Sequence, residues 1–131
     1  MSASTGVRVL RANGDSPELP IVQGEGAVSA IVWPGVGARL RSMQRIELAA
    51  GSRTISLKHP MEAVYYVTQG DGIVRAPEDG SSNPLIEGSM IHIEPGTAYV
   101  LEAGSDGIGL LGGPCPPDPS LYRQTGKAPT G

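Results

Sequence analysis

The feature that most constrains this chain is the alternation of short apolar, β-branched runs with turns rich in glycine and proline. No segment of about ten residues carries the apolar spacing of an amphipathic helix. The 19 Gly and 12 Pro residues separate runs of single-strand length, which is the pattern of strands joined by turns. A length of 131 residues suits one domain with its own core. We therefore predict an all-β sandwich or barrel.

The candidate strands are recognised by β-branched and aromatic residues or by alternation of polar and apolar positions. They cover residues 7–12, 27–33, 42–48, 54–59, 62–69, 73–76, 89–94, 95–103 and 107–113. The most strand-like run is EAVYYVTQ, and the GDG that follows it at 70–72 predicts a tight hairpin turn. Residues 13–20 and 77–84 read as loops. We expect one domain over residues 1–113. The Pro-rich tail over 114–131 is expected to be extended and to wrap around the domain before it frays.

Charge and composition exclude several classes of protein. The formal net charge is −3 and the basic residues are scattered, which argues against a nucleic-acid surface. No run approaches the roughly 18 apolar residues of a membrane span, and the first residues do not resemble a signal peptide. The single cysteine, Cys115, has no partner for an internal disulfide. These observations predict a cytoplasmic protein in which Cys115 is buried or incidental.

Residues 51–103 resemble the cupin superfamily in the spacing of two motifs. The matching positions are Gly51, Leu57, His59, Ala63 and Gly70 in the first motif, and Gly88, residues 94–96, Tyr99 and Ala103 in the second. The resemblance implies a cupin-type double-stranded β-helix, or jelly-roll barrel, that holds a metal or a small molecule in its mouth. It also implies a homodimer, because many cupins pair through their first sheet.

The resemblance breaks at the metal ligands. Cupins typically use three His and one Glu, a set suited to divalent transition metals. The four positions here read Leu57, His59, Ala63 and Tyr99, so one ligand of the four is kept. Residues 58–65 also resemble ectoine synthase, a cupin family in which the Glu before Ala-Val-Tyr binds the metal. That resemblance maps a ligand onto Glu62, but the family's Tyr and His ligands fall on Ile91 and Tyr99.

Three polar side chains are therefore the candidate catalytic groups: His59, Glu62 and Tyr99. His59 could act as a base or a metal ligand, and the Tyr99 phenol could donate a hydrogen bond to an oxyanion. Strand alternation points Glu62 outward, where it would form an ion pair with Lys58 or Arg53. A bulge beside Pro60 would turn it inward, and we expect this inward, functional orientation.

Apolar residues predicted to share the inner face form the expected wall of the site. They are Leu57, Tyr65, Val67 and Ile91. His92 follows an inward residue, so alternation places it on the outer face, at a candidate subunit contact.

Three hypotheses follow. The first is a cupin that binds a small organic ligand without the usual metal site. Such a protein either binds only, or catalyses a proton transfer such as isomerisation, cyclisation or elimination, with Glu62 as base and Tyr99 as acid. The second is a metalloenzyme in which His59, Glu62 and Tyr99 hold a divalent transition metal. The third is a structural or regulatory dimer whose barrel is filled by side chains. The substrate is not evident from the sequence.

Overall fold

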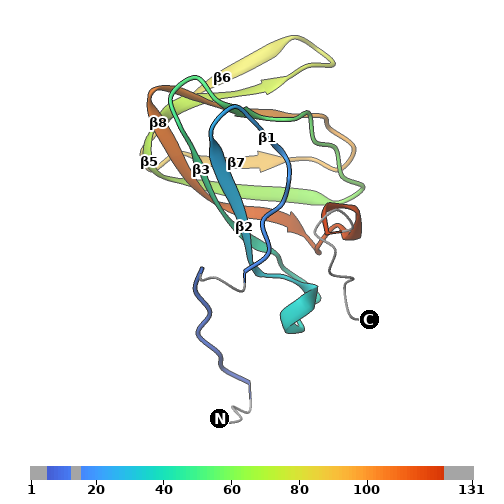
Figure 1. Cartoon of the computed structure of the whole chain (residues 1–131). Helices are drawn as coiled ribbons and strands as arrows, with labels where there is room; N and C mark the ends of the chain where they lie inside the picture. The colour runs from blue at the N-terminus through green and yellow to red at the C-terminus, as the bar shows by residue number, and fades with distance from the viewer. Residues whose placement is uncertain (1–5, 13–15, 123–131) are drawn as a thin grey trace.

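The computed structural model describes residues 6–12 and 16–122, and within them the protein is built from β-strands (Figure 1). The strands are β1 (Val22–Gln23), β2 (Gly26–Val32), β3 (Met43–Leu48), β4 (Arg53–Thr54), β5 (Glu62–Ala76), β6 (Ser81–Ile86), β7 (Met90–Ile93) and β8 (Val100–Cys115). Two short 3₁₀ helices complete the described elements, η1 (Pro34–Val36) and η2 (Pro119–Leu121). No helix in these two ranges is long and apolar enough to cross a membrane.

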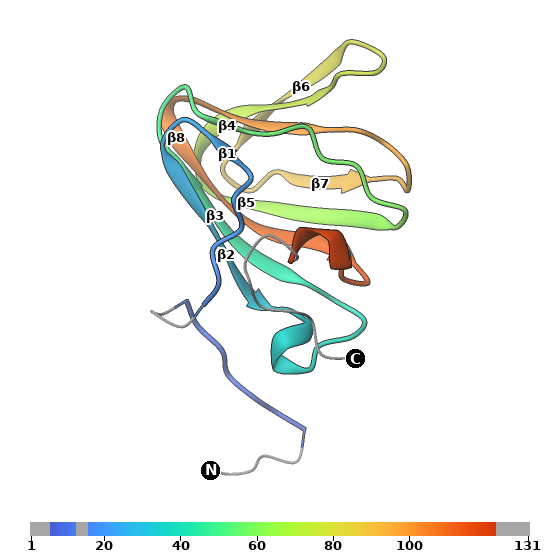
Figure 2. The same cartoon turned by 45° about the vertical axis from the view of Figure 1, so that its right-hand side comes forward.

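Two long strands, β5 and β8, connect the two layers of the barrel. The first half of β5 pairs with β7 and with the last half of β8, which continues to β3 and β2. The second half of β5 pairs with β6 and with the first half of β8, which continues to β4 and β1. All of these pairings are antiparallel. The sheet therefore curves around one interior, as Figure 2 shows from the side.

The prediction of a tight turn at residues 70–72 is wrong. The chain passes through this segment as one strand, β5, with register shifts between Val67 and Gln69 and between Gly70 and Gly72. Gly70 has a φ of 80°, and a β-carbon there would meet the carbonyl oxygen of Gly107 on β8. The glycines thus form a bulge that bends the strand from one layer to the other. In the same way, the strands predicted at 95–103 and 107–113 are parts of β8.

Other strand boundaries differ from the prediction. The cause is either that a predicted strand has no partner in the sheet, or that a predicted loop has one. Residues 7–12 form no strand, and Val7 and Val9 are exposed. The run at 54–59 contributes only its start to β4, followed by an isolated bridge between Leu57 and Tyr99. Much of the predicted loop at 77–84 belongs to β6, which pairs with β5 as a hairpin. The strands expected at 27–33 and 42–48 are confirmed as β2 and β3.

The core lies between the two layers and follows the alternation of the strands. Gln44, Ile46 and Leu48 of β3 are buried while the residues between them are exposed. Three tyrosines, Tyr65, Tyr99 and Tyr122, are among the largest fully buried side chains. Residues 116–122, the first part of the Pro-rich tail, pack against the barrel as expected, and Leu121 and Tyr122 are buried there (Figure 2). The rest of the tail, 123–131, lies outside the described residues.

Candidate functional site

A chain of four hydrogen-bonded side chains lies inside the barrel. The Oδ2 atom of Asp118 is 2.7 Å from Nδ1 of His59, and Nε2 of His59 is 2.8 Å from the Tyr99 hydroxyl. The Tyr99 hydroxyl is in turn 2.6 Å from the hydroxyl of Tyr65. All four side chains are buried, with at most 5% of any residue exposed. We call this set the relay.

Main-chain pairing explains why these residues meet. Leu57 and Tyr99 exchange two backbone hydrogen bonds of 2.8 Å, and the Gly96 amide donates to the His59 carbonyl at 2.7 Å. These bonds hold the segment before β5 against the segment before β8. Tyr65 points inward because it alternates with exposed residues along β5. Asp118 lies at the N-terminal end of η2, which follows β8 in the chain.

The protonation state of Asp118 determines which atom donates and which accepts in each hydrogen bond of the relay. Burial acts to raise the pKa of this carboxyl, but hydrogen bonds from His59 and Ser120 outweigh burial and the net pKa is lowered. Asp118 is therefore a carboxylate near neutral pH, and it can only accept. His59 must then carry its proton on Nδ1, so that in the neutral ring Nε2 accepts from Tyr99. The Tyr99 oxygen is left to accept from Tyr65.

Both tyrosines of the relay are held in the neutral form. Burial raises the pKa of Tyr99, and the neighbouring Tyr65 and the charge of Asp118 act in the same direction. Burial also raises the pKa of Tyr65, although its hydrogen bond to Tyr99 opposes the change. A free phenolate is thus disfavoured here. A proton can move through Tyr99 only if another proton leaves it at the same time.

A pocket of about 320 Å³ opens between β7 and the hairpin of β5 and β6. It is lined by Val74, Arg75, Ala76, Ser81, Asn83, Ile91, His92, Ile93, Glu94, Thr97, Ala98 and Tyr99. Tyr99 belongs to both the pocket and the relay. The pocket therefore adjoins one residue of the relay, and its lining combines apolar and polar side chains.

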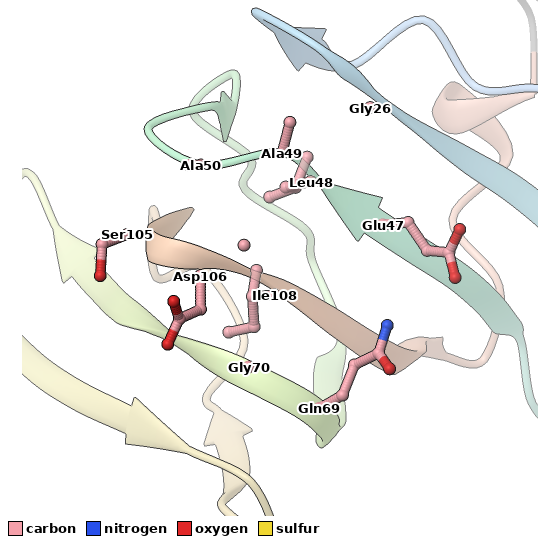
Figure 3. A pocket seen from close by; sticks show the side chains of 11 residues that line it. Gly26, Glu47, Leu48, Ala49, Ala50, Gln69, Gly70, Ser105, Asp106 and Ile108 are labelled. Atoms are coloured by element: carbon pink, nitrogen blue, oxygen red, sulfur yellow. The ribbon is translucent and has the colours of Figure 1, made fainter.

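A larger and more open hollow, of about 770 Å³, lies where β5 and β8 bend (Figure 3). Its polar lining includes Glu47, Gln69 and Asp106, and its remaining lining is formed mainly by small residues. None of the predicted site residues lines it.

The structure places most of the predicted wall residues as expected. Leu57, Tyr65, Val67 and Ile91 are buried inside the barrel. Of these, Ile91 lines the 320 Å³ pocket and Tyr65 belongs to the relay.

The expectation that Glu62 turns inward is wrong. Its side chain is 55% exposed, and its Oε2 atom lies 3.4 Å from Nε2 of His92, which is 56% exposed. The register of β5 runs without a shift from Glu62 to Val67, and its alternation begins with Glu62 on the outer face. The outward position predicted for His92 is confirmed, and Lys58 pairs with Glu78 instead of Glu62. His59 and Tyr99 thus meet without Glu62.

Asp118 is the site residue that sequence reasoning missed. It lies in a Pro-rich segment that resembles a solvated tail, and 59 positions separate it from His59. No local pattern connects the two. Cys115 is partly buried, and its Sγ atom is 3.5 Å from the Gly113 carbonyl.

Solved structures share this architecture. No family model and no curated protein sequence matches the chain. A cupin-like protein from Thermotoga maritima aligns with a TM-score of 0.68 and 20% identity, over 80% of this chain and 79% of that one. A predicted oxalate decarboxylase from the same organism aligns with a TM-score of 0.68 and 22% identity, over 82% of this chain and 98% of that one. The chain has the cupin fold.

Ectoine synthase from P. lautus is also among the similar cupins. Its TM-score is 0.65 at 15% identity, over 87% of this chain and 78% of that one. At this level of identity the likeness concerns the fold, and the chemistry has to be argued from the residues of this chain.

The residues at the usual cupin metal positions do not fit a divalent metal. Leu57 and Ala63 offer no donor atom, and the other two positions, His59 and Tyr99, are bonded to each other. The second ring nitrogen of His59 is engaged by Asp118. No group of three or more His, Cys, Asp or Glu within residues 6–12 and 16–122 is arranged to hold a metal ion. These four positions therefore do not supply the donor set that a divalent transition metal requires.

Proposed function

We propose that this cupin binds a small organic molecule and transfers a proton to or from it through Tyr99 and His59. The observation that carries the proposal is the relay, in which Tyr99 is hydrogen-bonded to His59 and also lines the 320 Å³ pocket. A buried acid–base pair beside a pocket is the arrangement that general acid–base catalysis requires. Glu62, which we first expected to be the base, takes no part in this mechanism.

Two proton transfers occur together. A ligand in the pocket gives a proton to the Tyr99 oxygen while Tyr99 passes its own hydroxyl proton to Nε2 of His59. The products are the ligand anion, a neutral tyrosine and an imidazolium that faces the Asp118 carboxylate. In the reverse direction the imidazolium returns the proton through Tyr99. Because no free phenolate forms, the mechanism agrees with the raised pKa of Tyr99.

The pocket indicates the chemical class of the ligand. Val74, Ile91 and Ile93 provide apolar contact, while Asn83 and Thr97 provide hydrogen-bonding groups. A small molecule with a short apolar body and a carbonyl or hydroxyl group suits this lining. Isomerisation, cyclisation and elimination of such a molecule each have a mechanism that begins with a proton transfer of this kind.

Binding can be tested by NMR with a library of small ketones, hydroxy acids and lactones. Methyl labels on isoleucine and valine report on Ile91 and Ile93 in the pocket, and on Val64 on the outer face as the reference. Binding compounds are expected to shift the isoleucine signals and leave Val64 unchanged. The proposal fails if no compound shifts Ile91, or if Val64 shifts equally. The homodimer stays a prediction, which light scattering of the purified protein can test.

A further inference from the structure

We propose that residues 116–122, here called the strap, form a latch over the relay, and that Asp118 is a positioning residue that holds His59 in the tautomer that the relay needs. The role of the strap in proton transfer rests on the proposed function. Its docking and its effect on the His59 tautomer do not. The strap contributes no atom to the 320 Å³ pocket, so its role is separate from ligand contact.

Apolar contacts hold the strap against the barrel. Tyr122 is fully buried, and its ring lies 5.2 Å from the ring of Trp33 at an angle of 35°. Leu121 is also in the hydrophobic core. At the base of the strap, the Ser42 hydroxyl donates to the Pro114 carbonyl at 2.6 Å. Burial of two large side chains gives the strap a driving force to dock that is independent of Asp118.

Both oxygens of the Asp118 carboxylate are occupied. Oδ1 accepts from the Ser120 amide at 3.0 Å and from the Ser120 hydroxyl at 2.9 Å. Oδ2 is left for Nδ1 of His59, at 2.7 Å. Ser120 therefore fixes the rotation of the carboxylate, and the carboxylate fixes the proton on Nδ1. The strap thus decides whether Nε2 of His59 is an acceptor for Tyr99.

Replacing Asp118 by Asn tests this assignment, because an amide has only one accepting atom. Ser120 offers two donors to the position of Oδ1, so the amide oxygen is expected to stay there. The amide nitrogen then faces His59 and donates to Nδ1. This favours the other tautomer, with the proton on Nε2, which donates to Tyr99 instead of accepting from it.

The chain offers a matched control in Asp79. Its carboxylate also accepts from the backbone amide two residues further on, Ser81, at 2.8 Å. Asp79 is exposed, in the turn between β5 and β6. Asp79→Asn therefore removes the same charge and perturbs the same local hydrogen bond, without contact with a histidine.

The experiment is an NMR measurement of imidazole ¹⁵N shifts in the full chain at neutral pH. The chain has two histidines, and exposed His92 serves as the reference. Wild type and Asp79→Asn are expected to show His59 with its proton on Nδ1, and Asp118→Asn is expected to move it to Nε2. His92 is expected to be unchanged in all three proteins. The proposal is overturned if Asp118→Asn leaves the His59 tautomer as it is, or if wild-type His59 already carries its proton on Nε2.

Docking of the strap is measured separately. Trp33 is the single tryptophan of the chain, and its contact with Tyr122 makes its emission a reporter of the strap. We expect Asp118→Ala to shift this emission to the red and to speed amide exchange at Leu121 and Tyr122 by about tenfold, because a charge-assisted hydrogen bond is lost. Unchanged emission and exchange would contradict the latch. If Asp118→Ala does not fold, Leu121→Ala, which removes an apolar contact of the strap and keeps the bond between Asp118 and His59, is expected to give the same two changes, and their absence would contradict the latch.

The two proposals can fail independently. If Asp118→Asn changes the tautomer but no compound binds the pocket, the positioning role stands and the proposed function falls. If a compound binds and exchanges protons equally well in Asp118→Asn, the function stands and the role of the strap in proton transfer is wrong.

Discussion

Removing the Tyr99 hydroxyl is the perturbation for which the structure gives the clearest magnitude. Tyr99→Phe keeps the ring but deletes the central atom of the relay, which contacts Nε2 of His59 at 2.8 Å and the Tyr65 hydroxyl at 2.6 Å. Two buried polar atoms lose a partner. At about 1–3 kcal/mol for each unsatisfied group, we expect a loss of about 2–6 kcal/mol in the free energy of unfolding. For a domain of this size, that lowers Tm by roughly 8–24 °C.

The assay is urea unfolding followed by circular dichroism, with thermal unfolding as a second measure. Tyr66→Phe is the matched control. Tyr66 lies on β5 and is 41% exposed, so this variant also lacks a phenol hydroxyl, but one at the surface. It is expected to change stability by less than about 0.5 kcal/mol. The double variant Tyr65→Phe/Tyr99→Phe removes both hydroxyls of the shortest bond, so its cost is expected to be smaller than the sum of the two single costs. Equal stabilities for Tyr99→Phe and Tyr66→Phe would refute the reasoning.

Three further predictions concern the fold and its titration. Gly70→Ala is expected to lower the free energy of unfolding by more than about 2 kcal/mol, because the new β-carbon meets a backbone oxygen. Gly51 has a similar φ of 75° with open space around it, so Gly51→Ala is expected to cost only about 1 kcal/mol. Denaturant midpoints of the two variants test the difference. Glu62→Gln is expected to leave stability and ligand binding unchanged, since Glu62 lies outside the relay. If the variant no longer showed the ligand-induced NMR shift, Glu62 would belong to the binding site. Burial raises the pKa of the three buried tyrosines, so as the pH rises these phenols ionise in the unfolded chain before they do so in the folded protein. The free energy of unfolding is therefore expected to be retained below about pH 10 and to fall as the pH rises above it. A flat profile of stability from about pH 9 to about pH 11 would contradict this.

The fold could be predicted because its signals are local or evenly spaced. Turn residues recur between short strands, and the alternation in residues 62–67 correctly separates inward Tyr65 from outward Tyr66. The same alternation pointed Glu62 outward, and the expected bulge that would have reversed it is absent. The GDG segment was misread because glycines with positive φ serve both hairpin turns and bulges. Only the contact of Gly70 with β8 distinguishes the two.

The site was predicted in part. His59 and Tyr99 were identified because they occupy motif positions with known spacing. Asp118 could not be predicted because a tail that wraps the barrel does not show which of its residues meets which side chain of the barrel. Contacts between residues far apart in the chain, such as His59 and Asp118, leave no periodic signal in a single sequence.

The most direct test of the central claim is hydrogen exchange into a ligand. Small ketones and lactones that bind the pocket would be incubated with the protein in D₂O, and the loss of C–H signals would be followed by proton NMR. The account predicts exchange with wild type and with Glu62→Gln, and none above background with Tyr99→Phe or His59→Gln. Exchange that persists in Tyr99→Phe, or that is absent from wild type for every bound compound, would contradict it.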